Sequence, residues 1–235
     1  MSEYQPTAPC GAASSIRAVA LLLSGLALTM NACPAAAAAV ALVPGAEPRR
    51  ADFKNEPASE DAMRMAQWIL DAGNNRALSF MIIDKKDARV FVFDPDGHLR
   101  GASPALLGAA IGDDSVPGIG DRKLSTILPE ERTTPAGRFV AALDHNIAGK
   151  DILWVDYANA ISLHRVVTGN AKERRAQRLA SPTTSDKRIS YGCINVPPKF
   201  FDKVVIPAFH RSNGIVYILP ETRPLATVFA GVGAR

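Results

Sequence analysis

Short runs rich in apolar, β-branched and aromatic residues dominate the middle of the chain and predict strands. They occur at 78–83, 89–93, 138–143, 152–155, 160–167 and 215–219, with another short run from His98. Turn residues at 84–87 and 94–97 separate the first three runs, which therefore predict a β-meander. Many closely spaced strands predict a mainly β fold, a β-sandwich or barrel with a few short helices.

Helical patterns are confined to three segments. A helix is predicted over residues 60–72, capped by Ser59 and ended by Gly73. Its apolar face should comprise Met63, Ala66, Ile69 and Leu70. A short helix is predicted over residues 171–179, and Pro197-Pro198 suit the first turn of a third helix that runs to about residue 209.

The N-terminus carries an uncharged apolar run at residues 18–30, directly after Arg17. It suits the core of a secretory signal and is too short to span a bilayer alone. Small residues follow at 31–33 and 35–39, where cleavage would fit, and residues 30–33 resemble a weak lipoprotein box. Residues 1–39 are thus predicted to be a signal peptide or a membrane anchor, which places the protein in the periplasm or cell envelope. The alternative is a buried Ala/Leu helix.

Composition and charge exclude few classes. The chain has 235 residues, of which 47% are hydrophobic and 21% charged, as is usual for a globular protein. The net charge of +4 is mild and spread along the chain. It would favour an anionic surface such as a cell wall, and we expect no nucleic-acid partner.

Cys193 is the only cysteine after the export-like segment, which contains Cys10 and Cys33. A lone thiol with a histidine elsewhere in the chain is a candidate nucleophile and base pair, and His164 lies upstream in a predicted strand. Alternation along that strand puts His164 on the face of Ser162, away from the large apolar residues. The alternative is an inert core thiol.

Residues 190–195, Ser-Tyr-Gly-Cys-Ile-Asn, surround this thiol, between a loop and a predicted helix. Gly192 lets the backbone turn sharply and lets a substrate carbonyl approach. The amides of Tyr191, Gly192 and Cys193 could donate to a tetrahedral oxyanion. Ser190 and Asn195 are further candidates for substrate binding, although Asn195 could equally hold the loop.

The same six residues resemble the Ser/Thr-His-Gly-Cys-hydrophobic-Asn/Arg signature of the L,D-transpeptidase (YkuD-like) catalytic domain. Residues 133–139, Thr-Thr-Pro-Ala-Gly-Arg-Phe, are similar to that family's Thr-Pro-x-Gly-x-Phe segment, and residues 161–164 resemble its histidine strand. The likeness covers roughly residues 75–220. Residues 40–74 are then a linker and short helix, and 221–235 a tail without clear pattern.

This resemblance implies that Cys193 is the nucleophile and His164 the base. It implies attack on a peptidoglycan stem peptide, release of D-alanine, and transfer of the acyl group to an amine, without metal or organic cofactor. L,D-carboxypeptidase activity, with water as acceptor, shares the first half of that chemistry. An inactive wall-binding module is the third alternative. Sortases and papain-like hydrolases fit less well by motif or chain order.

The sequence departs from the family pattern at three places. Tyr191 stands where the signature has a second histidine, and Arg165 follows the base where a small residue is common. The interval between His164 and the signature is long and holds a basic segment at 172–178. That segment could be a lid, a reader of anionic substrate groups, or a solvated helix face. A long loop at 108–136 is also expected to be functional.

The remaining histidines, His98, His145 and His210, are expected to be surface or capping residues. None is spaced for zinc, and no glycine-rich phosphate loop is present in the sequence.

Overall fold

The computed structural model describes residues 49–233. The predicted signal or anchor at 1–39, with Cys10 and Cys33, lies outside the described residues. All elements discussed below belong to one compact unit, Ala46–Arg235. Within the described part of the chain, none of the helices combines the length and apolarity needed to cross a membrane.

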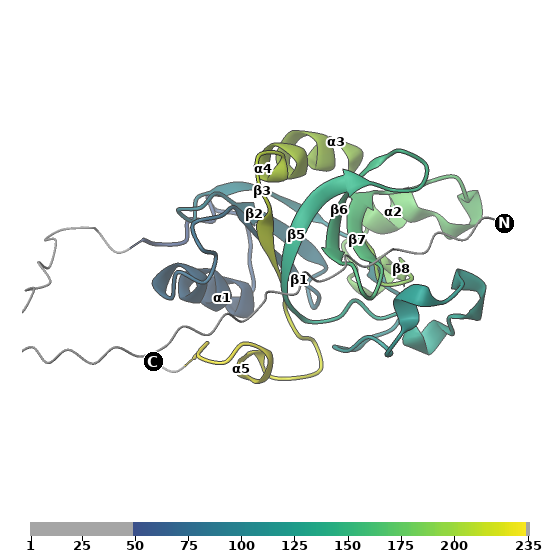
Figure 1. Cartoon of the computed structure of the whole chain (residues 1–235), viewed down its shortest axis with the longest axis horizontal. Coiled ribbons are helices and arrows are strands. Elements are labelled where there is room, and N and C mark those ends of the chain that lie inside the picture. Colours follow the sequence, from purple (N-terminus) through teal and green to yellow (C-terminus); the bar gives the residue numbers. More distant parts are fainter. Residues whose placement is uncertain (1–48, 234–235) are drawn as a thin grey trace, which may run out of the picture. The chain divides into compact units, whose positions relative to one another are not determined.

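Eight strands form one sheet in the order β3-β2-β1-β10-β5-β6-β7-β9 (Figure 1). Most neighbours are antiparallel, but β1 pairs with β10 and β7 with β9 in parallel. The strands are β1 Phe80–Asp84, β2 Arg89–Phe93, β3 Leu99–Pro104, β5 Gly137–His145, β6 Asp151–Asp156, β7 Ile161–Arg165, β9 Ile194–Val196 and β10 Gly214–Ile218. The predicted β-meander is confirmed as β1, β2 and β3.

The two edges of this sheet meet. Leu106, just beyond β3, exchanges two backbone hydrogen bonds with Asn195 of β9, at 2.8 and 2.9 Å. Beside this bridge, β4 (Leu107–Gly108) pairs in parallel with β8 (Arg188–Ser190). The sheet is therefore nearly closed, and the prediction of a mainly β sandwich or barrel with a few short helices is confirmed.

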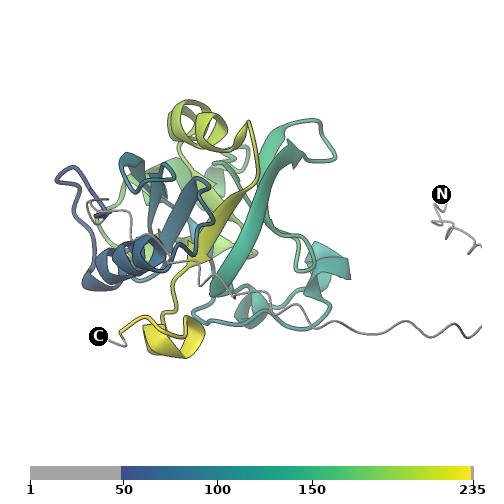
Figure 2. The same ribbon diagram turned by 60° about the vertical axis from the view of Figure 1, so that its left-hand side comes forward.

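Side chains alternate across the strands and feed two cores. On β1, Met81 and Ile83 belong to the core beneath α3 (Pro198–Phe200), the π-helix η6 (Phe201–Val205) and α4 (Ile206–Phe209). Phe80 and Ile82 belong to the other core, with α1 (Glu60–Asp71) and α5 (Leu225–Val228). Figures 1 and 2 show these two helical groups on opposite sides of the sheet.

Helix α1 begins where the sequence predicts, because the Ser59 hydroxyl accepts a hydrogen bond from the Ala62 amide at 3.0 Å. Its predicted apolar face is wrong at one position. Met63 is 47% exposed, whereas Met65 is fully buried. The buried stripe recurs at helical spacing through Ala62, Met65, Ala66 and Ile69, which leaves position 63 facing solvent.

The prediction that Cys193 lies between a loop and a helix is also wrong. It lies between two short strands, β8 and β9, and the helical segment begins only at Pro198. Three-residue strands offer too few positions for an alternating pattern, so the sequence did not reveal them.

The segment after Pro220 packs on the fold although its sequence shows little pattern. Leu225, Phe229 and Val232 are buried in the core of α1. The preceding turn is held by Asp113, whose carboxylate accepts hydrogen bonds from the amides of residues 221–223 and from the Thr222 hydroxyl.

A buried lysine joins this turn to the long loop. Lys85 is fully buried, and its ammonium donates to Asp113 Oδ1 at 2.8 Å and to the carbonyls of Gly112 and Thr134 at 2.6 and 2.8 Å. Three short helical turns occupy the loop itself: η1 Ile119–Asp121, η2 Leu124–Thr126 and η3 Pro129–Glu131. Both ends of the loop are thereby fixed to one buried ion pair.

Candidate active site

The turn from β8 to β9 presents Cys193 and requires a glycine before it. Gly192 has φ +124°, and a Cβ there would lie 2.6 Å from the carbonyl oxygen of Thr133 and 2.7 Å from Ile161 Cδ1. No L side chain fits both that backbone and that space. The glycine lets the backbone turn, as the sequence predicts. The space that a side chain would take is occupied by Thr133 and Ile161, not left open for a substrate carbonyl.

The pairing of β7 with β9 brings the histidine to the thiol. The two strands are parallel, and His164 is the register partner of Asn195. Alternation along each strand then puts Ser162 and His164 of β7 on the same face as Cys193 and Asn195. The Ser162 hydroxyl lies 3.7 Å from the Cys193 sulfur, which agrees with this geometry.

The environment of Cys193 favours the thiolate. Burial raises the pKa of the thiol, but the hydrogen bond and charge of His164, aided by Ser162, outweigh it and lower the pKa below its ordinary value. The thiolate is the reactive form of cysteine, and the lowered pKa means that a larger fraction of this cysteine is thiolate at a given pH than of an ordinary thiol.

The imidazole of His164 is oriented by a backbone carbonyl. Its Nδ1 donates to the Arg165 oxygen at 2.8 Å, which leaves Nε2 for the proton exchanged with Cys193. Burial lowers the pKa of His164, but the hydrogen bond and charge of the Cys193 thiolate raise it above its ordinary value on balance. The third group that orients the base is thus main chain, which sequence reasoning did not identify.

Arg165 fills a structural role with its side chain. The guanidinium pairs with Asp202 of η6 at 2.6 Å and with Asp151 of β6 at 3.3 Å, and it lies over the Phe201 ring. Because side chains alternate along β7, Arg165 lies on the opposite face of the strand from His164, where it ties β7 to β6 and η6.

The Ser190 hydroxyl organises the turn around the thiol. It donates to the Cys193 carbonyl at 2.6 Å and accepts from the Gly192 amide at 3.1 Å. The Gly192 amide is thus already engaged. Among residues 49–233, no backbone acceptor engages the amides of Tyr191 and Cys193, so these two of the three predicted oxyanion donors are available.

Thr134, from the segment that resembles Thr-Pro-x-Gly-x-Phe, fixes the same turn from the other side. Its hydroxyl donates to the Gly192 carbonyl at 2.8 Å and accepts from the Gly108 amide at 2.9 Å. The motif therefore contacts the predicted nucleophile turn directly.

A cavity of about 90 Å³ opens beside Cys193. The long loop supplies much of its wall, and Tyr191 lies next to the thiol. Its lining includes Ile119, Arg122, Leu124, Ile127, Thr133 and Ile161. Tyr191 is stacked against Arg132, whose guanidinium lies 4.0 Å from the ring centroid. The prediction that the loop is functional is therefore consistent with its position at the thiol.

Asn195 is fully buried, and its side chain contacts both members of the predicted catalytic pair. Its Nδ2 faces Nε2 of His164 at 3.4 Å and the Cys193 carbonyl at 3.3 Å. Its Oδ1 accepts from Arg175 at 2.7 Å. Arg175 belongs to α2 (Arg175–Ala180), within the basic segment that sequence reasoning left open.

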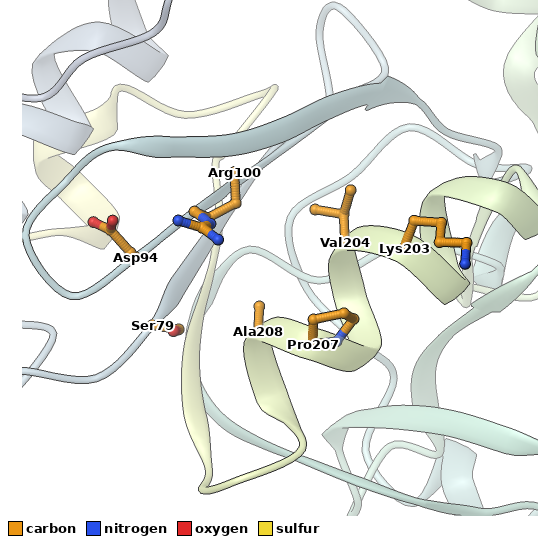
Figure 3. Close-up of a pocket in the computed structure, with 7 residues that line it drawn as sticks. All are labelled: Ser79, Asp94, Arg100, Lys203, Val204, Pro207 and Ala208. Carbon is orange, nitrogen blue, oxygen red and sulfur yellow. The ribbon is translucent and has the colours of Figure 1, made fainter.

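A larger cavity, of about 220 Å³, lies elsewhere and contains neither Cys193 nor His164 (Figure 3). The β-meander and the segment 203–208 line it, with Arg100, Lys203 and Asp94 as its charged residues.

The remaining histidines, His98, His145 and His210, are exposed. In the described part of the chain, no group of three or more metal-ligating side chains is arranged to hold an ion.

Comparison with known proteins gives similarity in structure only. No protein-family model matches the chain, and no curated protein matches it. Pgp2, a helical cell shape determining protein of Campylobacter jejuni, is 15% identical over 62% of this chain and 49% of its own, with a TM-score of 0.41. The chain thus spans about half the length of Pgp2.

Two other similar structures are L,D-transpeptidases. The enzyme from Xylanimonas cellulosilytica is 16% identical over 65% of this chain and 68% of its own, with a TM-score of 0.37. The catalytic domain from Enterococcus faecium is 12% identical over 61% of this chain and 98% of its own, with a TM-score of 0.36. Sequence identities and TM-scores this low do not support a shared activity.

Proposed function

We propose that this protein is an exported cysteine L,D-transpeptidase that acts on peptidoglycan stem peptides. One observation carries the proposal: the parallel register of β7 and β9 brings His164 to the face of the sheet that holds Cys193, and Nδ1 of the base is held by a carbonyl at 2.8 Å. This is the arrangement that thioester chemistry requires. The nature of the substrate comes from the motif resemblance.

In the acylation half, the Cys193 thiolate attacks the carbonyl carbon of the stem peptide. The carbonyl oxygen becomes an oxyanion, which the amides of Tyr191 and Cys193 stabilise, each contributing roughly 3–4 kcal/mol in the transition state. The C–N bond then breaks, and Nε2–H of His164 protonates the departing amine of D-alanine. The product is a thioester on Cys193 and a neutral His164.

In the second half, an amine of a neighbouring stem attacks the thioester carbonyl. His164 takes the amine's proton on Nε2, the C–S bond breaks, and the Cys193 thiolate is restored. Water in place of the amine would complete an L,D-carboxypeptidase cycle through the same steps.

The decisive experiment is muropeptide analysis of the protein incubated with tetrapeptide stems. We expect D-alanine release, a thioester adduct on Cys193 in intact mass, and cross-linked dimers. Cys193→Ala should abolish all three, because a methyl group cannot attack a carbonyl.

Two other results have definite meanings. Release of D-alanine with tripeptide products but no dimers would assign the carboxypeptidase reaction. No adduct and no turnover in a folded protein that still binds peptidoglycan would contradict the proposal and leave a wall-binding module.

A further inference from the structure

The basic segment between His164 and the signature reaches the predicted base through one side chain. Arg175 is the first residue of helix α2, and its side chain is largely buried, with 15% exposed. Its Nε pairs with the Glu173 carboxylate, and its Nη1 donates to Asn195 Oδ1. A solvated helix face therefore does not describe this residue.

This contact decides which way the Asn195 amide points. A guanidinium carries donors only, so the atom of Asn195 that faces it must be the acceptor, Oδ1. The NH₂ group is then on the opposite side, where it faces His164 Nε2 at 3.4 Å and the Cys193 carbonyl at 3.3 Å.

We propose that Arg175 is a positioning residue for the Cys193–His164 pair, because it fixes Asn195 so that an N–H group is directed at Nε2 of His164. This inference rests on the proposed role of His164 as base. An N–H directed at Nε2 stabilises the unprotonated nitrogen, which can take a proton, and opposes the imidazolium, which already carries one there.

The charges around His164 agree with this direction. The Cys193 thiolate raises the pKa of His164, whereas the Arg175 guanidinium lowers it. Glu173 partly neutralises Arg175, and the Arg165 guanidinium on the same strand is engaged by Asp202 and Asp151. Arg175 thus opposes the effect of the thiolate on the pKa of His164, so that Nε2 can both release and accept a proton.

The test is an NMR titration of His164 in the full chain with Cys193→Ala, which removes the thiolate and all turnover. Labelled histidine gives four resonances to follow, and His164→Gln identifies the relevant one. Arg175→Met should raise the pKa of His164, and Arg175→Lys, which keeps a charged donor, should raise it less. Arg178→Met is the matched control, since Arg178 also lies on α2 but its guanidinium donates to the carbonyls of Glu173 and Asp186 and, among the described residues, makes no hydrogen bond to Asn195.

A second series separates orientation from charge. In an Asn195→Ala background, Arg175→Met should move the pKa of His164 much less than in the parent. Asn195→Ser serves the same purpose if the alanine variant does not fold. An unchanged titration in Arg175→Met, an equal shift in Arg178→Met, or a full shift without Asn195 would each overturn the inference. Because no turnover is measured, failure here is distinct from failure of the proposed reaction.

Discussion

At the scale of single residues, the reactivity of Cys193 depends on one neighbour. His164 lowers the pKa of the thiol through its hydrogen bond and charge, against the opposing effect of burial. The phenol ring of Tyr191 is stacked on Arg132 and, unlike an imidazole, has no ring nitrogen that could exchange a proton with the thiol. The two residues should therefore differ sharply when replaced.

We expect His164→Ala to move the alkylation profile of Cys193 to higher pH, because the cation that stabilises the thiolate is lost. Tyr191→Phe should leave the profile nearly in place. The measurement is the rate of iodoacetamide labelling against pH, read on the tryptic peptide of residues 189–199, which contains Cys193 but neither of the other two cysteines. An unmoved profile in His164→Ala would mean that another base serves the thiol.

A substitution at Gly192 tests whether the close contact of the Cys193 turn with Thr133 matters for stability. Gly192→Ala places a Cβ 2.6 Å from the Thr133 carbonyl oxygen in a left-handed backbone, so unfolding free energy and thiol reactivity should both fall. Gly149→Ala is the control, since φ there is +70° but no atom lies within 4 Å. Strain alone should cost the control about 1–2 kcal/mol in urea unfolding. Equal losses in the two variants would show that the contact with Thr133 is unimportant.

At the scale of elements, the long loop and the segment after Pro220 depend on the same buried ion pair. Burial raises the pKa of Asp113, but hydrogen bonds from Lys85, Thr222 and backbone amides outweigh it and hold the pKa well below its ordinary value. The folded protein therefore prefers the carboxylate. Its stabilising effect is complete above the unfolded-state pKa of about 3.9 and is lost as pH falls toward the folded value.

Asp113→Ala should lower the free energy of unfolding at pH 7 by about 3 kcal/mol, because the buried Lys85 loses the carboxylate that it is hydrogen-bonded to and retains the more distant Glu221, at 3.6 Å. Asp113→Asn should also flatten the acid side of the stability curve below about pH 5. Urea titrations across pH measure both effects. Asp114→Asn is the control, because Asp114 is exposed and pairs with Arg223 at the surface, so it should cost no more than about 1 kcal/mol.

The elements also show what the sequence can predict here. The longer strands and α1 follow from alternation, turn residues and the Ser59 cap, and the Cys193–His164 pair follows from their motifs. The position of Cys193 between strands does not, because β8 and β9 are too short to show a period. Neither does the contact of Arg175 with Asn195, since it depends on a tertiary approach of α2 to β9.

At the scale of the whole molecule, the core extends beyond residues 75–220. Phe229 of the C-terminal segment is buried and contacts Tyr217 of β10, with ring centroids 6.2 Å apart. We expect Phe229→Ala to lower the free energy of unfolding by about 3 kcal/mol. Thr227→Ala, on the exposed side of α5, should change it little. Thermal and urea unfolding measure both, and equal effects would place the segment outside the core.

The parallel pairing of β1 with β10 has a consequence for biosynthesis. These strands are neighbours in the middle of the sheet, yet Phe80 pairs with Ile215 from the far end of the chain. Contacts between such distant residues must overcome a large loop-closure entropy, so they form late. A ribosome must therefore have released the chain through Ile218 before the central sheet can assemble, and until then its apolar strands are open to chaperones and proteases.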